Sequence, residues 1–310
     1  MIWENKTIVM EFILLGLTND PVFQIIIFVF FLNAYIIILC GNSLIILLTM
    51  RDSSLQTPMY FFLTNLSFVD IFYSTSTIPR LLKDLLSINK IISFSECAAQ
   101  MYITLSLGEC ECVLLAIMAY DRYVAICYPL HYTTIINRSV CIRIATGTWL
   151  CGFILSISLV SLTLNVDRCG HNEINHFSCE VPEILSLGCG DILFAELSIF
   201  VFGVILLMTP VTFIVISYVK IIMTILQIAS SAGQRKAFST CGSHMLVVTM
   251  FYVSGMAAYM KPRSSSIPGT DKMISVFYNI VTPMFNPLIY TFRNKTVKTA
   301  IKKLKIKRIL

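Results

Sequence analysis

Seven long stretches of this chain carry almost no charge, and they constrain its fold more than any other feature. Residues 22–50 run for 29 positions without an Asp, Glu, Lys or Arg. A helix needs about 20 apolar residues to cross the hydrocarbon core of a membrane, so each stretch is long enough to span it. The sequence therefore predicts seven transmembrane helices, at about 22–50, 58–79, 97–120, 144–166, 197–219, 237–260 and 273–292.

The composition excludes the other broad classes of protein. Of the 310 residues, 56% are hydrophobic and 13% are charged, about half the charge of an ordinary soluble domain. The apolar runs also lack the polar alternation of porin strands. We therefore expect an all-α membrane protein: a single seven-transmembrane helix bundle over residues 1–310, held in the lipid bilayer. The net charge of +6 indicates basic loop ends at the membrane surface, with no nucleic-acid partner.

Basic residues predict how the bundle is oriented. If the C-terminus is cytoplasmic, 15 of the 23 Lys and Arg residues lie inside and 8 lie outside, as the positive-inside rule requires. Residues 1–21 are then an extracellular N-terminus, and residues 293–310 are a cytoplasmic tail. Apolar residues recur among the lysines of this tail, at Val297, Ile301 and Leu304. They predict a short amphipathic helix on the inner leaflet.

Cysteines and glycosylation motifs divide between the two sides. Cys97, Cys169, Cys179 and Cys189 lie on the predicted outer side, where an oxidising compartment allows two disulfides in any of three pairings. The other seven cysteines lie within spans or inside and are expected to be free thiols. Of four N-x-[ST] motifs, only the one at Asn5 faces outward, so only Asn5 is a candidate glycosylation site.

Three acidic residues fall within the predicted spans. Asp70 lies near the middle of the second span, and Glu109 and Glu111 lie near the middle of the third. A charge at this depth is costly, so each acid needs a partner or a proton. Asp70 and one glutamate could hold a cation or share a proton, or the acids could be neutral and bonded to Ser, Thr and Asn neighbours. Glu109 and Glu111 point about 200° apart on one helix, so they cannot both face Asp70.

Two further motifs mark the cytoplasmic ends of spans. Asp121 and Arg122 end the third span, where they form either a solvated pair of little energetic value or a latch that opens with the bundle. Pro283 and Pro287 flank Asn286 in the seventh span, and they interrupt its hydrogen-bond ladder where the helix could bend or hold a static kink.

Together these motifs resemble those of the odorant (olfactory) receptors, a branch of the rhodopsin-like G protein-coupled receptors. DRY covers residues 121–123 and NPxxY covers 286–290. The finer signature consists of TPMYFFL at 57–63, MAYDRYVAICYPLHY at 118–132, KAFSTC at 236–241 and PMFNPLIY at 283–290. Glu109 departs from the pattern, because the family usually has a small residue there.

The resemblance implies a function and residues that perform it. A volatile odorant binds within the bundle in the plasma membrane, and a stimulatory heterotrimeric G protein then raises cAMP; the protein is no enzyme. The family's outer bridges correspond to Cys97–Cys179 and Cys169–Cys189, and its sodium-site acids correspond to Asp70 and Glu111, with no other cofactor. The residues matching its activation and coupling motifs are Asp121, Arg122, Tyr123, Tyr218, His244 and Tyr290.

Helical spacing suggests which residues line the ligand pocket. Residues three or four apart share a helix face, and such sets occur on the third, fifth and sixth spans. They predict a mostly apolar pocket of Thr104, Leu105, Gly108, Glu109, Cys112, Phe202, Leu206, Tyr252, Met256 and Tyr259. An ionised Glu109 would favour an amine, and a neutral one would donate to a carbonyl or ether oxygen. Alternatively, Glu109 turns towards a Ser or Thr of the fourth span.

Two other functions were weighed. A channel or transporter typically has charged residues on several pore-lining helices, or paired broken helices in its two halves. Here the charges within the spans lie on only two adjacent spans, which does not favour that function. Tyr120-Asp121 and Gly188-Cys189-Gly190-Asp191 resemble the motifs of intramembrane aspartyl proteases. Under the predicted topology these two aspartates lie at opposite faces, roughly 30 Å apart, too far for a catalytic dyad.

Overall fold

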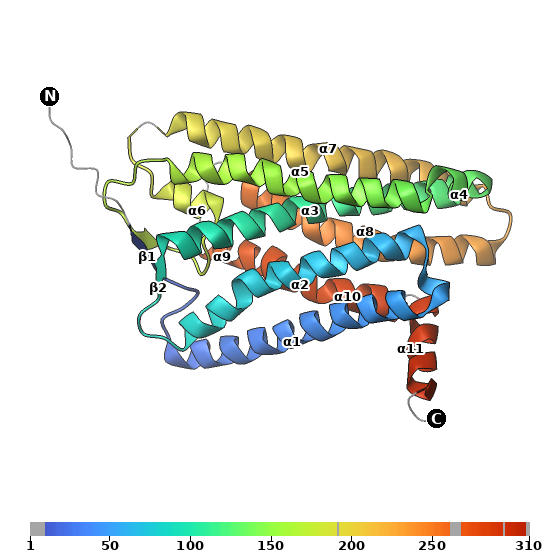
Figure 1. Ribbon diagram of the computed structural model, residues 1–310, viewed down its shortest axis with the longest axis horizontal. Helices are drawn as coiled ribbons and strands as arrows, with labels where there is room; N and C mark the ends of the chain where they lie inside the picture. Colours follow the sequence, from blue (N-terminus) through green and yellow to red (C-terminus); the bar gives the residue numbers. More distant parts are fainter. Residues whose placement is uncertain (1–9, 191, 261–267, 294, 308–310) are drawn as a thin grey trace.

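The computed structural model describes residues 10–190, 192–260, 268–293 and 295–307, and within them the chain is mostly helical. Five of the described helices are long and apolar enough to cross a membrane: α1 (Pro21–Arg51), α3 (Phe94–Cys127), α5 (Arg138–Leu164), α7 (Leu193–Leu226) and α8 (Ser231–Tyr259). Helix α2 (Pro58–Leu85) is comparably long and packs between α1 and α3. These helices run side by side along the long axis of the molecule (Figure 1).

The stretch predicted as the seventh span is a helix in three parts. It consists of α9 (Pro268–Val276), a turn of π-helix η4 (Phe277–Val281), and α10 (Thr282–Arg293), which contains Pro287. Helix α11 (Lys295–Lys307) follows and turns away from the bundle axis (Figure 1).

Local sequence signals explain where the long helices begin. Asp20 accepts hydrogen bonds from the backbone amides of Val22 and Phe23 (2.9 and 3.2 Å) ahead of Pro21, the first residue of α1. Ser93 and Glu96 form a reciprocal capping box at the start of α3. Side chains and a pre-set proline thus satisfy amides that the helices cannot pair internally.

Helix α3 is the centre of the bundle. In its most apolar stretch, 56% of the residues are buried within the protein, compared with 17% in α1 and 6% in α7. It packs against α2, α5, α7 and α8. Side chains on α3 therefore face other helices on most sides, whereas α1 and α7 present apolar side chains outward, as helices facing lipid do.

The short elements gather at the two ends of the bundle. A three-stranded sheet and α6 (Val181–Ser186) lie at the end with the N-terminus, whereas η1 (Ser53–Leu55), α4 (Tyr132–Ile135) and α11 lie at the other end (Figure 1). A 3-10 turn, η2 (Pro129–His131), joins α3 to α4.

The small sheet is a feature that the sequence patterns did not predict. Strand β1 (Glu11–Leu14) lies at its centre, antiparallel to β2 (Ile91–Ser93) and parallel to β3 (Glu173–Ile174). Phe12 of β1 is completely buried and stacks on Phe94, with the Arg168 guanidinium 5.7 Å from its ring centre. The segment before α1 is thereby fixed to two loops distant in sequence.

Candidate functional site

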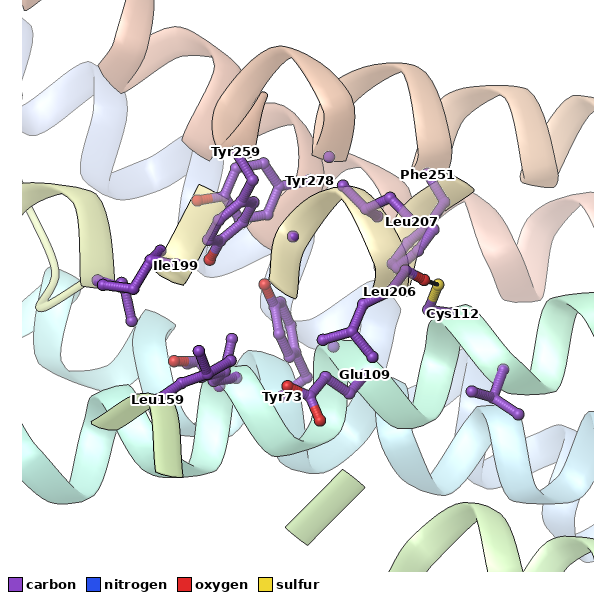
Figure 2. A pocket seen from close by; sticks show the side chains of 17 residues that line it. Tyr73, Glu109, Cys112, Leu159, Ile199, Leu206, Leu207, Phe251, Tyr259 and Tyr278 are labelled. Carbon is purple, nitrogen blue, oxygen red and sulfur yellow. Dashed lines mark hydrogen bonds between the residues drawn. The ribbon is translucent and has the colours of Figure 1, made fainter. Parts of the chain in front are cut away.

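An internal cavity of about 100 Å³ lies among α3, α7, α8 and η4, and we call it the inner cavity (Figure 2). Its walls are mostly apolar, with three tyrosine rings and one carboxyl group. The lining residues are Tyr73, Thr104, Leu105, Gly108, Glu109, Cys112, Val113, Leu159, Val181, Ile199, Gly203, Leu206, Leu207, Phe251, Gly255, Tyr259 and Tyr278. This combination suits a small, largely apolar ligand.

Most of the pocket residues expected from helical spacing line this cavity. All five from α3 do so, and Leu206 of α7 and Tyr259 of α8 join them. The five α3 residues are Thr104, Leu105, Gly108, Glu109 and Cys112.

Phe202, Tyr252 and Met256 do not line the inner cavity, which corrects the expectation from spacing. On α8 the lining residues are Phe251, Gly255 and Tyr259, so the expected face was displaced by one residue, a rotation of about 100°. Tyr252 instead donates to the backbone oxygen of Cys112 (2.7 Å). Met256 packs against the buried core, and Phe202 is 37% exposed on the outer face of α7.

Glu109 is the one acidic side chain that lines the inner cavity. It is 8% exposed, and neither carboxyl oxygen has a hydrogen-bond partner. Ser156 of α5, in the fourth span, lies beside it, as the alternative expectation had it. The Ser156 hydroxyl donates to the backbone oxygen of Gly152 (2.8 Å), so it can only accept a hydrogen bond from a protonated Glu109. In Figure 2 the carboxyl group lies on the α3 side of the cavity. The hydrogen-bonding capacity of the carboxyl group is thus not filled within the protein.

A second, outer cavity of about 250 Å³ adjoins the first. The two share Ile199, Tyr259 and Tyr278 as lining residues. Four acidic residues line the outer cavity, and no Lys, Arg or His is among its described lining residues. The acidic residues are Glu180, Glu183, Glu196 and Asp271.

Glu180 joins the loop between α5 and α7 to the helices α9 and η4. Its Oε1 accepts from Ser178 (3.0 Å) and Asn279 (2.8 Å). Its Oε2 accepts from Ser275 (3.3 Å) and from the hydroxyl of Tyr278. A loop carboxylate therefore bonds residues of both α9 and η4.

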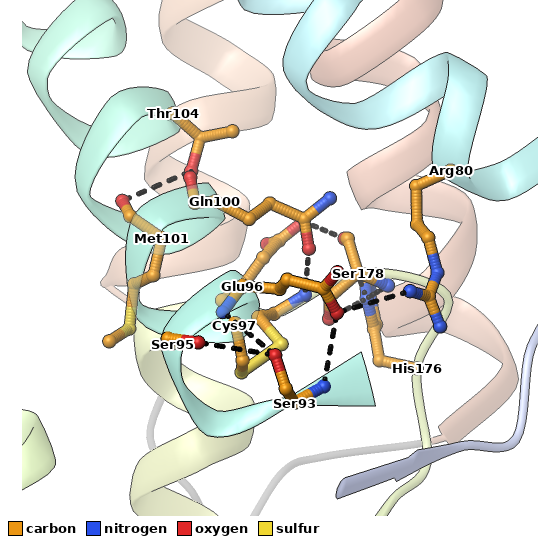
Figure 3. Close-up of a disulfide and its surroundings, with 12 residues drawn as sticks. Arg80, Ser93, Ser95, Glu96, Cys97, Gln100, Met101, Thr104, His176 and Ser178 are labelled. Carbon is orange, nitrogen blue, oxygen red and sulfur yellow. Dashed lines mark hydrogen bonds and ion pairs between the residues drawn. A yellow bond between two sulfur atoms is a disulfide. The ribbon is translucent and has the colours of Figure 1, made fainter. Parts of the chain in front are cut away.

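Two disulfides hold this loop: Cys97–Cys179 and Cys169–Cys189, with Cα atoms 5.4 and 6.1 Å apart. Near the first, the backbone amide of Cys179 donates to Gln100 Oε1 (2.9 Å) (Figure 3). His176 lies close by, and burial lowers its pKa below the ordinary value of 6.5. The loop over the outer cavity is thus covalently tied to α3.

Asp70 and Glu111 are brought together beneath the inner cavity. The Asn286 amide of α10 donates to both oxygens of Asp70 (3.0 and 3.2 Å) and to Glu111 Oε1 (3.4 Å). Asn42 of α1 also lies beside Asp70. Four helices thus contribute oxygen-bearing side chains to one buried cluster. Within it the Asn286 Oδ1 oxygen has no partner, and neither does the Ser74 hydroxyl one turn along α2 from Asp70.

At the end of the bundle with α4 and α11, Asp121 is held by a tyrosine rather than by its neighbour. Tyr132 of α4 donates to Asp121 Oδ1 (2.7 Å), and the described residues show no ion pair between Asp121 and Arg122. Consecutive helical residues diverge by about 100°, which opposes such a pair. The Tyr218 hydroxyl bonds His244 Nδ1 (2.6 Å), with stacked rings.

Arg122 lies near several of the residues expected to form the activation switch. Tyr218, His244 and Tyr290 all lie within its electrostatic range. Tyr123 donates to Tyr128 (3.4 Å).

Several cavity residues have no local sequence signal. Tyr73, Val181 and Tyr278 come from α2, α6 and η4, and only packing brings them together. Glu180 could have been noticed as the acid directly after the bridged Cys179.

Comparison with known proteins assigns the chain to a family. A sequence model of the family described as "Olfactory receptor" matches residues 31–308. Olfactory receptor 2B2 of Homo sapiens is 47% identical over 310 residues, covering 100% of this chain and 87% of that protein. Olfactory receptor 2B6 of Mus musculus is 47% identical over 309 residues, covering 100% and 98%. Olfactory receptor 2K2 of Homo sapiens is 49% identical over 301 residues, covering 97% and 95%.

Proposed function

Because this chain belongs to the olfactory receptor family, we propose that it is an odorant receptor whose inner cavity binds a small, mostly apolar volatile molecule. The observation that carries the proposal is the cavity within the helix bundle, whose described lining is apolar except for three tyrosines, a threonine, a cysteine and the acid Glu109. Family membership makes the chain a multi-pass membrane protein of a receptor class, with odorants and G proteins as its general partners.

A cavity-filling variant tests where the odorant binds. A Cβ atom added at Gly203 meets only Tyr259, at 3.8 Å or more, so Gly203→Leu fits the backbone and extends into the cavity. It should raise the EC50 of an agonist found by cAMP screening of an odorant panel by roughly tenfold or more. Gly147→Leu is the matched control, because nothing lies within 4 Å of its added Cβ. Equal potency in both variants would move the binding site elsewhere.

We propose that seven helices span the plasma membrane with the N-terminus outside and α11 on the inner leaflet. The distribution of Lys and Arg supports this, as do the disulfides at the end opposite the lysine-rich α11. Asn5, the expected glycosylation site, lies outside the described residues. Enzymatic deglycosylation of the parent and of Asn5→Gln tests the orientation, and a glycan on Asn137 would overturn it.

We propose that the receptor activates a stimulatory G protein through its cytoplasmic end. An agonist favours an open bundle by binding it more tightly than the closed one. Movement of α8 away from α3 and α7 would separate Tyr218 of α7 from His244 of α8 and present Arg122 and Tyr290 to the C-terminal helix of the G protein. Arg122→Ala should abolish agonist-driven cAMP at normal surface expression, and unchanged signalling would refute this role.

We propose that Asp70 and Glu111 hold a sodium ion. The residues fit such an ion, because the Asn286 amide joins the Asp70 and Glu111 carboxyl groups, the Asn286 Oδ1 oxygen has no partner, and hard cations prefer oxygen ligands. The cation would neutralise charge that hydrocarbon cannot solvate. Replacing buffer sodium with a bulky organic cation should change agonist potency. The same change in an Asp70→Asn, Glu111→Gln double variant would place the effect elsewhere.

A further inference from the structure

We infer that the ligand of the inner cavity is a small primary or secondary amine, bound through its nitrogen to the Glu109 carboxyl group. The inference rests on the proposed odorant-binding function and narrows it to one chemical class.

Glu109 is the acidic group among the described residues that line the inner cavity, and its hydrogen bonds are not filled within the protein. The Thr104 hydroxyl already donates to the backbone oxygen of Gln100 (2.8 Å). The Cys112 thiol lies 3.2 Å from both the backbone oxygen of Leu206 and the Tyr252 hydroxyl. Glu109, by contrast, has the Ser156 hydroxyl beside it, but neither of its buried oxygens makes a hydrogen bond of normal geometry. A buried polar group of this kind costs free energy until a ligand satisfies it.

An amine meets the needs of this carboxyl group better than an oxygen acceptor does. A carbonyl or ether can accept one hydrogen bond from the acid, which leaves the second carboxyl oxygen unpaired. An ammonium group has at least two N–H donors, so it can serve both oxygens in charge-assisted bonds.

Proton transfer allows the ion pair to form without burying net charge. The free amine enters the cavity and meets the neutral acid, since an isolated carboxylate is not stable in such surroundings. The O–H bond of Glu109 breaks, and its proton forms a new N–H bond on the ligand. The electron pair of the broken bond stays on the oxygen and gives the carboxylate its negative charge. The new ammonium group lies directly against this charge.

The outer cavity favours the same class of ligand. Glu180, Glu183, Glu196 and Asp271 line it, and Tyr259 and Tyr278 continue from it into the inner cavity. Lys272 lies within electrostatic range of Glu183, but its Nζ donates to the backbone oxygen of Gly16 (2.7 Å), and it does not line the cavity. The acidic side chains of the described lining disfavour a carboxylate odorant.

The test compares amines with their matched alcohols on the full-length receptor. Linear primary amines of three to eight carbons and alcohols of the same lengths are applied to expressing cells, with cAMP as the readout and with competition against an agonist from an odorant panel. We expect the best amine to act at a concentration roughly tenfold or more below its alcohol. Glu109→Gln should raise the amine EC50 by about 10- to 100-fold and the alcohol EC50 by much less, because the alcohol forms no charge-assisted bond.

The outcomes separate this inference from the proposed function. If no panel odorant or alcohol changes cAMP, the odorant-receptor proposal fails. If odorants act but amines neither activate nor compete better than alcohols, only the amine inference fails. An equal loss for both classes in Glu109→Gln also refutes it, and the alcohol response verifies that the variant is folded. A second control changes the ligand and needs no variant. The alkyltrimethylammonium ion of the same chain length has no N–H donor and no free-base form, so a potency equal to that of the primary amine would refute the inference.

Discussion

Replacing Glu180 by Ala removes a carboxylate on which four donors converge at the outer end of the bundle. Two of these donors belong to η4 and one to α9, whereas Glu180 directly follows the Cys97–Cys179 disulfide. The variant therefore leaves the donor groups of Ser275, Tyr278 and Asn279 without their shared acceptor. We expect the outer loop to separate from α9 and η4 as a result.

The structure sets the size of this effect. A hydrogen bond to a charged group contributes about 1.5–3 kcal/mol, and removing one partner of a buried charged network costs about 3–5 kcal/mol. Glu180 also lines the outer cavity, so water can reach the donor groups that lose their acceptor. We therefore expect Glu180→Ala to reduce the free energy of unfolding by about 3 kcal/mol, the lower end of that range. Glu180→Gln keeps the shape and one acceptor oxygen, and the hydroxyls of Ser275 and Tyr278 can turn to accept from its amide. We expect it to cost about 1 kcal/mol.

Thermal unfolding of the solubilised receptor measures these losses. Glu180→Ala should lower Tm by roughly 5–10 °C, and Glu180→Gln should lower it by less. A double-mutant cycle with Tyr278→Phe should give a coupling of about 1 kcal/mol or more. A Glu180→Ala receptor that melts with the parent, or that shows no coupling to Tyr278, would refute the role of Glu180 as a tie between loop and helix.

Three other sites give predictions. Gly152→Val should reduce the free energy of unfolding by about 1–3 kcal/mol and so lower Tm, because an added Cβ would lie 2.7 Å from Cys110 Sγ. Gly147→Val places its Cβ in open space and should leave Tm unchanged. Stability should fall as the pH drops below 6.5, because burial lowers the pKa of His176 and the unfolded chain therefore binds a proton that the folded protein does not. Between pH 7.5 and 5, the Tm of His176→Phe should decline less than the Tm of the parent receptor. Tyr252→Phe should raise agonist-free cAMP by freeing α8 from Cys112, and unchanged basal cAMP would contradict this.

The long helices could be predicted because membrane insertion leaves a strong trace in sequence. A charge-free run such as 22–50 has few alternatives to a helix, and it falls within α1 (Pro21–Arg51). The helical character of the chain is confirmed. The sheet was not predictable in the same way, since β1 and β3 have four and two residues, and each strand exists only through pairing with a distant segment.

The pocket residues illustrate where sequence reasoning loses accuracy. On α3 the expected face lines the cavity, because two acids of opposite phase, Glu109 and Glu111, orient the helix. Helices α7 and α8 are apolar on several sides, so nothing in their sequence distinguishes Phe251 from Tyr252. An error of one residue then turns the expected face by about 100°. Glu180 and His176 were missed for another reason: a loop has no period from which burial can be deduced.

Helix α8 physically connects the inner cavity with the Tyr218–His244 contact. Phe251 lines the cavity, and the next residue, Tyr252, ties α8 to α3 at Cys112. His244 lies eight residues earlier, about 12 Å along the axis, and bonds Tyr218 of α7. A ligand on Glu109 sits one helical turn from Cys112 on α3. A ligand that displaces Phe251 rotates α8 and so acts directly on the hydrogen bond of the next residue, Tyr252. Because α8 is continuous from Tyr252 back to His244, this rotation also reaches the His244–Tyr218 contact. Two hydrogen bonds on one rigid helix thus favour the closed arrangement, and a ligand that weakens the first lowers the cost of breaking the second.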